Sequence, residues 1–155
     1  MDKIRDWLYI GSLRDTQNLA ALEESGISAV LQLAGASPQK GIVSYLLPVE
    51  DGEPLAASVL REGLSFVADQ RQKNKRVLIA CAAGVSRSAT FAVAALKEAE
   101  QIPLLDALRM LVAAHPETLP NPILWRSLCD FYSESVALVE MVRICRPRNI
   151  PGAGE

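Results

Sequence analysis

Short apolar runs alternate along the chain with longer segments whose apolar residues recur every three or four positions. The runs are rich in Val, Ile and Leu and are bounded by glycines or polar residues, a pattern typical of buried strands. They predict strands at residues 7–10, 27–33, 42–49 and 77–80.

Between these runs the apolar residues fall on one side of a helix. One helix carries Leu19 and Leu22, with Asp15 or Thr16 as its N-cap and Gly26 at its end. Further helices are predicted around residues 59–67 and 89–96, from Pro103 to about Ala114, and from Asn121-Pro122 through Phe131, with room to continue to Val142.

This alternation predicts a single α/β domain whose central, mostly parallel sheet is flanked by helices. A chain of 155 residues fits one domain. We assign residues 1–142 to that domain and residues 143–155 to a tail that is first basic and then rich in Pro and Gly. Ligands of such sheets bind at the carboxyl ends of the strands, so functional residues are expected in the loops that follow them.

The composition narrows the candidate functions. Half of the residues are hydrophobic and the formal net charge is −2, which leaves no overall basic field to attract nucleic acid or an anionic membrane. The charged N-terminus lacks the apolar segment of a signal peptide, and no apolar run approaches the ~20 residues that span a bilayer. We therefore expect a cytoplasmic protein, with the nucleus as a further compartment, and neither nucleic acid nor membrane as a partner.

The single His and the three widely spaced Cys restrict the chemistry further. One imidazole excludes zinc sites built from several His, and the absence of a CxxC pair favours free thiols in a reducing compartment. No metal or other cofactor is expected. His115, before Pro116 at a predicted helix end, is interpreted as a solvated cation, and Cys129 and Cys145 as buried core residues.

One segment combines a reactive residue with an anion site. Cys81 follows the apolar run 77–80 directly and lies shortly before the buried helix. A short loop between a strand and a helix N-terminus directs several backbone N–H groups to one point. The helix dipole, these amides and Arg87 favour the thiolate of Cys81, which is the competent nucleophile. The candidate phosphate-binding residues are Ala82, Ala83, Gly84, Val85, Ser86 and Arg87.

The neighbouring residues fit phosphoryl transfer. Arg87 can hold two phosphate oxygens while the thiolate attacks phosphorus, and Ser88 can donate its hydroxyl to the sulfur as it leaves. Asp51, in the loop after another predicted strand, is the candidate general acid for the leaving oxygen and general base for the hydrolytic water. Glu50 or Glu53 could take its place.

The chain resembles a small dual-specificity protein phosphatase of the cysteine-dependent protein tyrosine phosphatase superfamily. The resemblance covers residues 7–132. It rests on Trp7-Leu8-Tyr9-Ile10-Gly11-Ser12, Gly26-Ile27-Ser28-Ala29-Val30-Leu31, Pro48-Val49-Glu50-Asp51, Cys81-Ala82-Ala83-Gly84-Val85-Ser86-Arg87-Ser88 and Pro120-Asn121. It implies a protein tyrosine phosphatase-like fold and hydrolysis through a phosphocysteine. In the roles it implies, Cys81 is the nucleophile, Arg87 the phosphate clamp, Ser88 the sulfur donor and Asp51 the general acid.

The resemblance also bears on substrate and rate. The loop lacks the basic residues of phosphoinositide phosphatases, which indicates phosphoprotein substrates, with phosphotyrosine and phosphoserine or phosphothreonine both accepted. Ala80 stands where the family has His, a residue that orders the loop and favours the thiolate. We therefore expect a slower enzyme. A binding module with little or no turnover and a phosphatase of a non-protein substrate are the alternatives.

Overall fold

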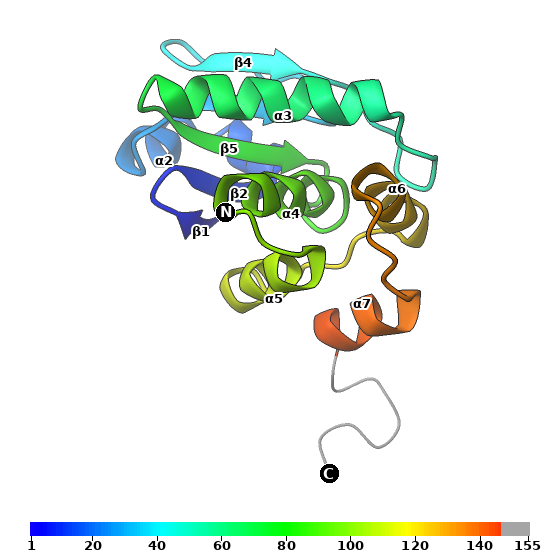
Figure 1. The fold of residues 1–155 in the computed structure, drawn as a ribbon. Coiled ribbons are helices and arrows are strands. Elements are labelled where there is room, and N and C mark those ends of the chain that lie inside the picture. The colour runs from blue at the N-terminus through cyan, green and yellow to red at the C-terminus, as the bar shows by residue number, and fades with distance from the viewer. Residues whose placement is uncertain (147–155) are drawn as a thin grey trace.

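The computed structural model describes residues 1–146, which form one five-stranded sheet with helices against both faces (Figure 1). The strands are β1 (Asp2–Arg5), β2 (Leu8–Ser12), β3 (Ile27–Gln32), β4 (Val43–Leu46) and β5 (Arg76–Cys81). The helices are α1 (Leu13–Thr16), α2 (Leu19–Glu24), α3 (Ala57–Gln72), α4 (Arg87–Glu100), α5 (Leu104–Ala114), α6 (Pro122–Tyr132) and α7 (Leu138–Cys145). The expected α/β fold class is confirmed.

The central strand of the sheet is β5, and the strand order is β1-β2-β5-β3-β4. β5 is parallel to both its neighbours, β2 and β3, and β4 is parallel to β3. The carboxyl ends of these strands therefore meet at one edge of the sheet. Cys81, the last residue of β5, lies at that edge.

The two faces of β5 belong to different apolar clusters. Ile79 and Cys81 lie in the larger cluster, which includes residues of α3, α4 and α5. Leu78 and Ala80 lie in a smaller one with Leu22 of α2. Successive side chains of a strand point to opposite faces, so residues 80 and 81 are separated by the sheet.

Strand β1 is not predicted by the hydrophobic pattern. Its sequence is Asp-Lys-Ile-Arg, and only Ile4 is buried. It pairs antiparallel with β2 at the edge of the sheet, where one set of its backbone groups has no partner among the described strands. Backbone pairing along an edge needs little apolar burial, which explains why the pattern missed this strand.

The first helical region divides into α1 and α2, and its caps differ from the prediction. Ser12 caps α1 and Asn18 caps α2, whereas Asp15 or Thr16 was expected. Asp15 lies inside α1, where its carboxylate accepts a hydrogen bond from the Ser12 amide at 2.8 Å. Ser12 and Asp15 thus form a reciprocal capping box.

The last predicted helix also divides in two. α6 begins at Pro122 with Asn121 as its N-cap, as predicted, but it ends at Ser133 in a left-handed conformation (φ 52°). The separate helix α7 runs to Cys145, so the predicted domain boundary after residue 142 falls inside a helix. Arg146 of the predicted tail donates hydrogen bonds to the carbonyls of Pro116 and Glu117 at 3.1 Å. Residues 147–155 of that tail lie outside the described residues.

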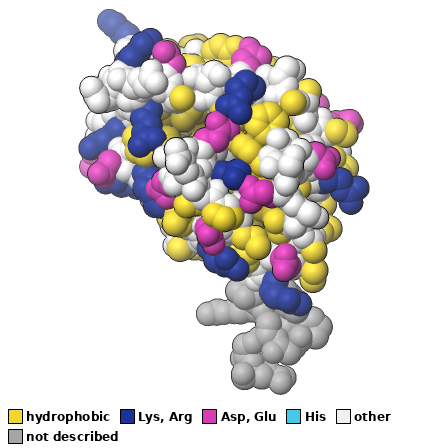
Figure 2. Space-filling model, in the orientation of Figure 1, with side chains coloured by type: hydrophobic (Ala, Val, Ile, Leu, Met, Phe, Trp, Pro, Cys, Tyr) yellow, Lys and Arg dark blue, Asp and Glu magenta, His cyan; other side chains and the backbone are white. Residues whose placement is uncertain are grey.

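Basic and acidic side chains are interspersed on the face of the molecule in Figure 2. Two ion pairs link separate elements. Arg5 contacts Glu100 of α4 at 2.5 Å, and Arg61 of α3 contacts Glu98 of α4 at 2.8 Å. Among residues 1–146, no helix combines the length and apolar character that crossing a membrane requires.

Candidate active site

The loop after β5 turns sharply at Gly84 to reach α4. Gly84 has φ +74°, a left-handed value that favours glycine. A Cβ at this position would lie 2.9 Å from the carbonyl carbon and oxygen of Gly11. The loop therefore packs against the end of β2 at a distance that only glycine permits.

Two polar groups surround the sulfur of Cys81. The backbone amide of Gly84 donates a hydrogen bond to Sγ at 3.3 Å, and the Ser88 hydroxyl oxygen lies 3.2 Å from Sγ. Both groups can donate to a thiolate, which stabilises the charged sulfur in a buried position. The structure thus brings Cys81, Gly84 and Ser88 together.

Asp51 reaches the same site from the loop after β4. The Ser86 hydroxyl donates a hydrogen bond to Asp51 Oδ1 at 2.7 Å and accepts one from the Asn121 amide at 2.8 Å. Ser86 is the N-cap of α4, yet its side chain makes no capping hydrogen bond within the helix. Its hydroxyl instead connects the Asp51 loop with the segment before α6.

Arg87 also joins the two loops. Its guanidinium donates a hydrogen bond to the carbonyl of Val49 at 3.0 Å. Cys81, Arg87 and Asp51 all line one cavity of about 480 Å³, whereas Glu50 and Glu53 are not among the described residues that line it. The placement of Asp51 favours it over either Glu as the general acid.

The other walls of the cavity come from segments in which the sequence analysis named no catalytic or phosphate-binding residue. Leu119 and Asn121 line it from the connection before α6, and Met141 and Arg146 line it from α7 and its end. The phosphate loop is held from outside as well, because the Val85 carbonyl accepts a hydrogen bond from the Leu119 amide at 3.0 Å and the Ala82 carbonyl accepts one from the Leu13 amide at 3.3 Å.

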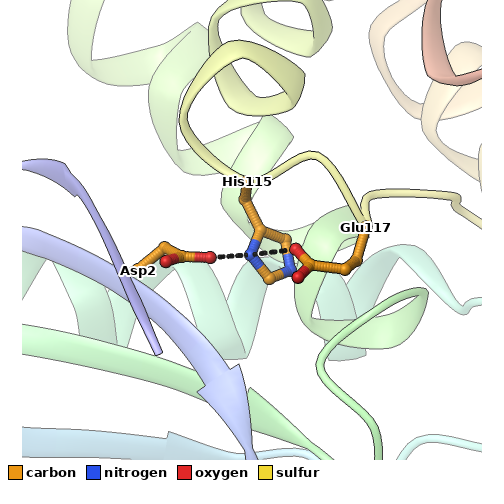
Figure 3. Close-up of side chains that lie close together, drawn as sticks. All are labelled: Asp2, His115 and Glu117. Atoms are coloured by element: carbon orange, nitrogen blue, oxygen red, sulfur yellow. Dashed lines mark hydrogen bonds and ion pairs between the residues drawn. The ribbon is translucent and has the colours of Figure 1, made fainter.

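His115 is not the solvated cation that the sequence suggested. It is 6% exposed, and its Nε2 lies 2.6 Å from the carbonyl oxygen of Gly84. Its Nδ1 lies 2.5 Å from Asp2 Oδ2 and 3.2 Å from Glu117 Oε2, and Figure 3 shows both carboxylates directed at the ring. Nothing in the local sequence indicates these contacts, because residues 2, 84 and 115 meet only in the folded chain.

Comparison with known proteins identifies the family of this domain. The family model described as "Dual specificity phosphatase, catalytic domain" matches residues 8–134. The chain belongs to the dual specificity phosphatase family. It is 32% identical to mouse dual specificity protein phosphatase 2 over 123 residues, which cover 77% of this chain and 39% of that protein. It is also 32% identical to human dual specificity protein phosphatase 6 over 135 residues, or 83% of this chain and 35% of that one.

The fold agrees with solved structures of the family. The crystal structure of human DUSP28 has a TM-score of 0.80 and 23% sequence identity, and the match covers 86% of this chain and 96% of that one. The chain spans well under half the length of the two curated phosphatases above. The comparisons therefore establish the family and the fold of this domain.

Ala80 is the one departure from the dual specificity phosphatase pattern noted in the sequence. It is 2% exposed and packs in the small cluster against α2, on the opposite face of the sheet from Cys81. A His ring introduced there would have to displace apolar side chains such as Leu22, at a cost in stability. The slower turnover expected from Ala80 stays a prediction.

The three thiols of this dual specificity phosphatase domain differ in environment. Burial raises the pKa of Cys145 to about 11 and also raises that of Cys129. At pH 7 only about one Cys145 thiol in 10⁴ is then ionised, and the thiolate is the reactive form. We expect iodoacetamide to modify Cys81 first, as measured by timed alkylation and peptide mass mapping. Modification of Cys145 before Cys81 would contradict this.

Proposed function

We propose that this domain hydrolyses phosphotyrosine and phosphoserine or phosphothreonine on proteins through a phosphocysteine intermediate. One observation carries the proposal: Cys81, with Gly84 and Ser88 at its sulfur, shares a cavity with Arg87 and Asp51. The proposed nucleophile Cys81, phosphate clamp Arg87 and general acid Asp51 therefore line the same cavity. A reducing compartment such as the cytoplasm, or the nucleus as well, would keep the three free cysteines as thiols.

The first chemical step transfers the phosphoryl group to the enzyme. The Cys81 thiolate attacks phosphorus, the bond from phosphorus to the substrate oxygen breaks, and protonated Asp51 gives its proton to that oxygen. The loop amides and the Arg87 guanidinium stabilise the charge on the three other phosphoryl oxygens. The products are the dephosphorylated side chain and a phosphocysteine.

The second step returns the enzyme to its starting state. The Asp51 carboxylate takes a proton from a water molecule as that water attacks phosphorus. The sulfur–phosphorus bond breaks, inorganic phosphate leaves, and the Ser88 hydroxyl donates to the sulfur that departs as a thiolate. Atoms and charge balance with water as the only co-reactant.

The side chains of the phosphate loop suit a phosphoprotein better than a strongly anionic lipid or nucleotide. The loop side chains at 82, 83 and 85 are Ala, Ala and Val, so Arg87 is its only cation. A ligand with several phosphates would find no further charge within the loop to pair with. A single phosphate on a peptide needs only the amides and Arg87.

The role of Asp51 can be tested through the leaving group. Asp51→Asn will lower kcat on a phosphoserine peptide by about 10²- to 10⁴-fold, because a serine alkoxide is too basic to leave without a proton. The loss on p-nitrophenyl phosphate will be much smaller, since nitrophenolate leaves readily as an anion. Steady-state kinetics on both substrates give the comparison.

Glu50→Gln and Glu53→Gln are the matched controls, because they remove exposed carboxylates of the same loop. Both will retain the wild-type ratio of the two rates. An equal loss on both substrates in Asp51→Asn would show that Asp51 supports the loop without donating the proton. A wild-type protein that binds phosphopeptide with no turnover of either substrate would favour the binding module.

A further inference from the structure

His115 contacts the phosphate loop from outside the active-site cavity. It follows the last turn of α5, and it is absent from the residues that line that cavity, although Gly84, which it touches, is part of the loop. The ring is 6% exposed. Burying a polar ring costs free energy unless its nitrogens form hydrogen bonds. Both ring nitrogens of His115 have partners.

The partners fix the protons on the ring. A backbone carbonyl oxygen only accepts hydrogen bonds, so Nε2 must carry a proton toward Gly84. Ionised carboxylates also only accept, so Nδ1 must carry a proton toward Asp2, with Glu117 beyond it at 3.2 Å. Both ring nitrogens of His115 face acceptors, so a protonated ring donates from both, and its bond to Gly84 is then charge-assisted.

Gly84 connects this contact to the nucleophile. Its amide donates a hydrogen bond to Cys81 Sγ at 3.3 Å, while its carbonyl oxygen accepts one from His115 Nε2 at 2.6 Å. Gly84 has a left-handed φ, and because a glycine backbone can adopt many conformations, other contacts must keep it in this one. We propose that His115, oriented by Asp2, is a positioning residue that fixes Gly84 and thereby the amides that bind phosphate and support the sulfur. This inference rests on the proposed function of the loop.

The position of His115 gives it a role that residue 80 cannot fill. The Ala80 side chain packs against apolar residues on the α2 face of the sheet and carries no polar atom that could bind the loop. His115 reaches the loop from α5, and Asp2 of the edge strand β1 holds its other nitrogen. The contact to the loop thus combines β1, near the N-terminus, with the residue that follows α5.

The same three side chains could in principle hold a divalent cation, because their ligand atoms lie within 4.8 Å of one another. The 2.5 Å separation of Nδ1 and Asp2 Oδ2 is that of a direct hydrogen bond. A metal bonded to both atoms would hold them further apart, since each metal–ligand bond alone is about 2 Å long. The observed geometry favours a proton between them.

Two substitutions separate the two hydrogen bonds. In His115→Gln the amide nitrogen can reach the position of Nε2 and donate to Gly84, but it carries no charge. In His115→Asn the amide nitrogen takes the position of Nδ1, so the bond to Asp2 is kept and the bond to Gly84 is lost. The probe is inorganic phosphate, measured by the concentration that half-protects Cys81 from alkylation by iodoacetamide.

We expect the half-protecting phosphate concentration to rise about tenfold or more in His115→Asn and to stay within about threefold of wild type in His115→Gln. Thermal unfolding of both variants controls for general destabilisation. Equal protection in wild type and His115→Asn, or equal losses in both variants, would overturn the inference. Stabilisation of the wild type by zinc, lost in Glu117→Gln, would overturn it in favour of a metal site.

Phosphate protection of the wild-type protein tests the proposed function of the loop independently of His115. If phosphate does not protect Cys81 of the wild-type protein, the proposed function fails before His115 is considered. If phosphate protects the wild type and His115→Asn equally, the proposed function stands and only the role of His115 is rejected.

Discussion

Cys81→Ser will lower kcat on p-nitrophenyl phosphate by about 10⁴-fold or more. A serine hydroxyl stays protonated at neutral pH and would need a base to become a nucleophile. The groups that contact the atom at this position, the Ser88 hydroxyl and the Gly84 amide, are hydrogen-bond donors and cannot remove that proton. The thiolate, in contrast, needs no base. Initial rates at saturating substrate measure the loss.

Phosphate binding is expected to survive this substitution. Arg87 and the loop amides are unchanged, and oxygen is smaller than sulfur, so the loop can still bind phosphate. The affinity for inorganic phosphate, measured by calorimetry, will stay within about tenfold of wild type. Cys145→Ser is the matched control, because Cys145 is buried in the core on α7 and does not line the cavity. Turnover of Cys81→Ser above a few per cent of wild type would refute the role of Cys81.

The sequence predicted those parts of the fold and site that depend on local pattern. The run Val77–Ala80 is apolar on both faces because β5 is the central strand, and the next residues lead directly to α4. A strand, a short glycine-containing loop and a helix N-terminus form a contiguous unit of the chain. The arrangement of Cys81, Gly84 and Ser88 could therefore be read without knowledge of the rest of the molecule.

Asp51 was predicted from the resemblance and from its place after a strand, and the structure explains why that sufficed. β4 lies two strands from β5 in a parallel sheet, so the loops after both strands are at the same edge. The interaction that holds Asp51, a hydrogen bond from the Ser86 hydroxyl, was not predictable. Ser86 was predicted only as a phosphate-binding residue of the loop, and its side chain bonds outside the helix because Asn121 and Asp51 approach it in the fold.

The errors share a physical cause. The edge strand β1, the contacts of His115 and the packing of α7 beside the cavity all depend on segments that are distant in sequence. An edge strand leaves a weak alternation signal, and one polar residue leaves none. The helical period across residues 122–142 was also misleading, because it continues beyond Ser133 although the backbone there takes a left-handed turn.

Arg87 connects the phosphate site to the acid loop, which makes it the second residue with a large expected effect. Its guanidinium donates to the Val49 carbonyl, two residues before Asp51, while the same planar group is placed to hold phosphoryl oxygens. Lysine keeps the positive charge but offers a single ammonium in place of a fork, so it cannot serve both partners at once. Arg87→Lys will lower kcat/KM on a phosphotyrosine peptide by about 10²- to 10³-fold.

Arg126→Lys is the matched control, since Arg126 is exposed on α6 outside the cavity, and its kcat/KM will stay at the wild-type value. Because Arg87 also positions the acid loop, its replacement will add a leaving-group dependence like that of Asp51→Asn, with a larger loss on phosphoserine than on p-nitrophenyl phosphate. A variant that loses phosphate affinity with no change in that ratio would show that Arg87 binds phosphate without organising the acid loop.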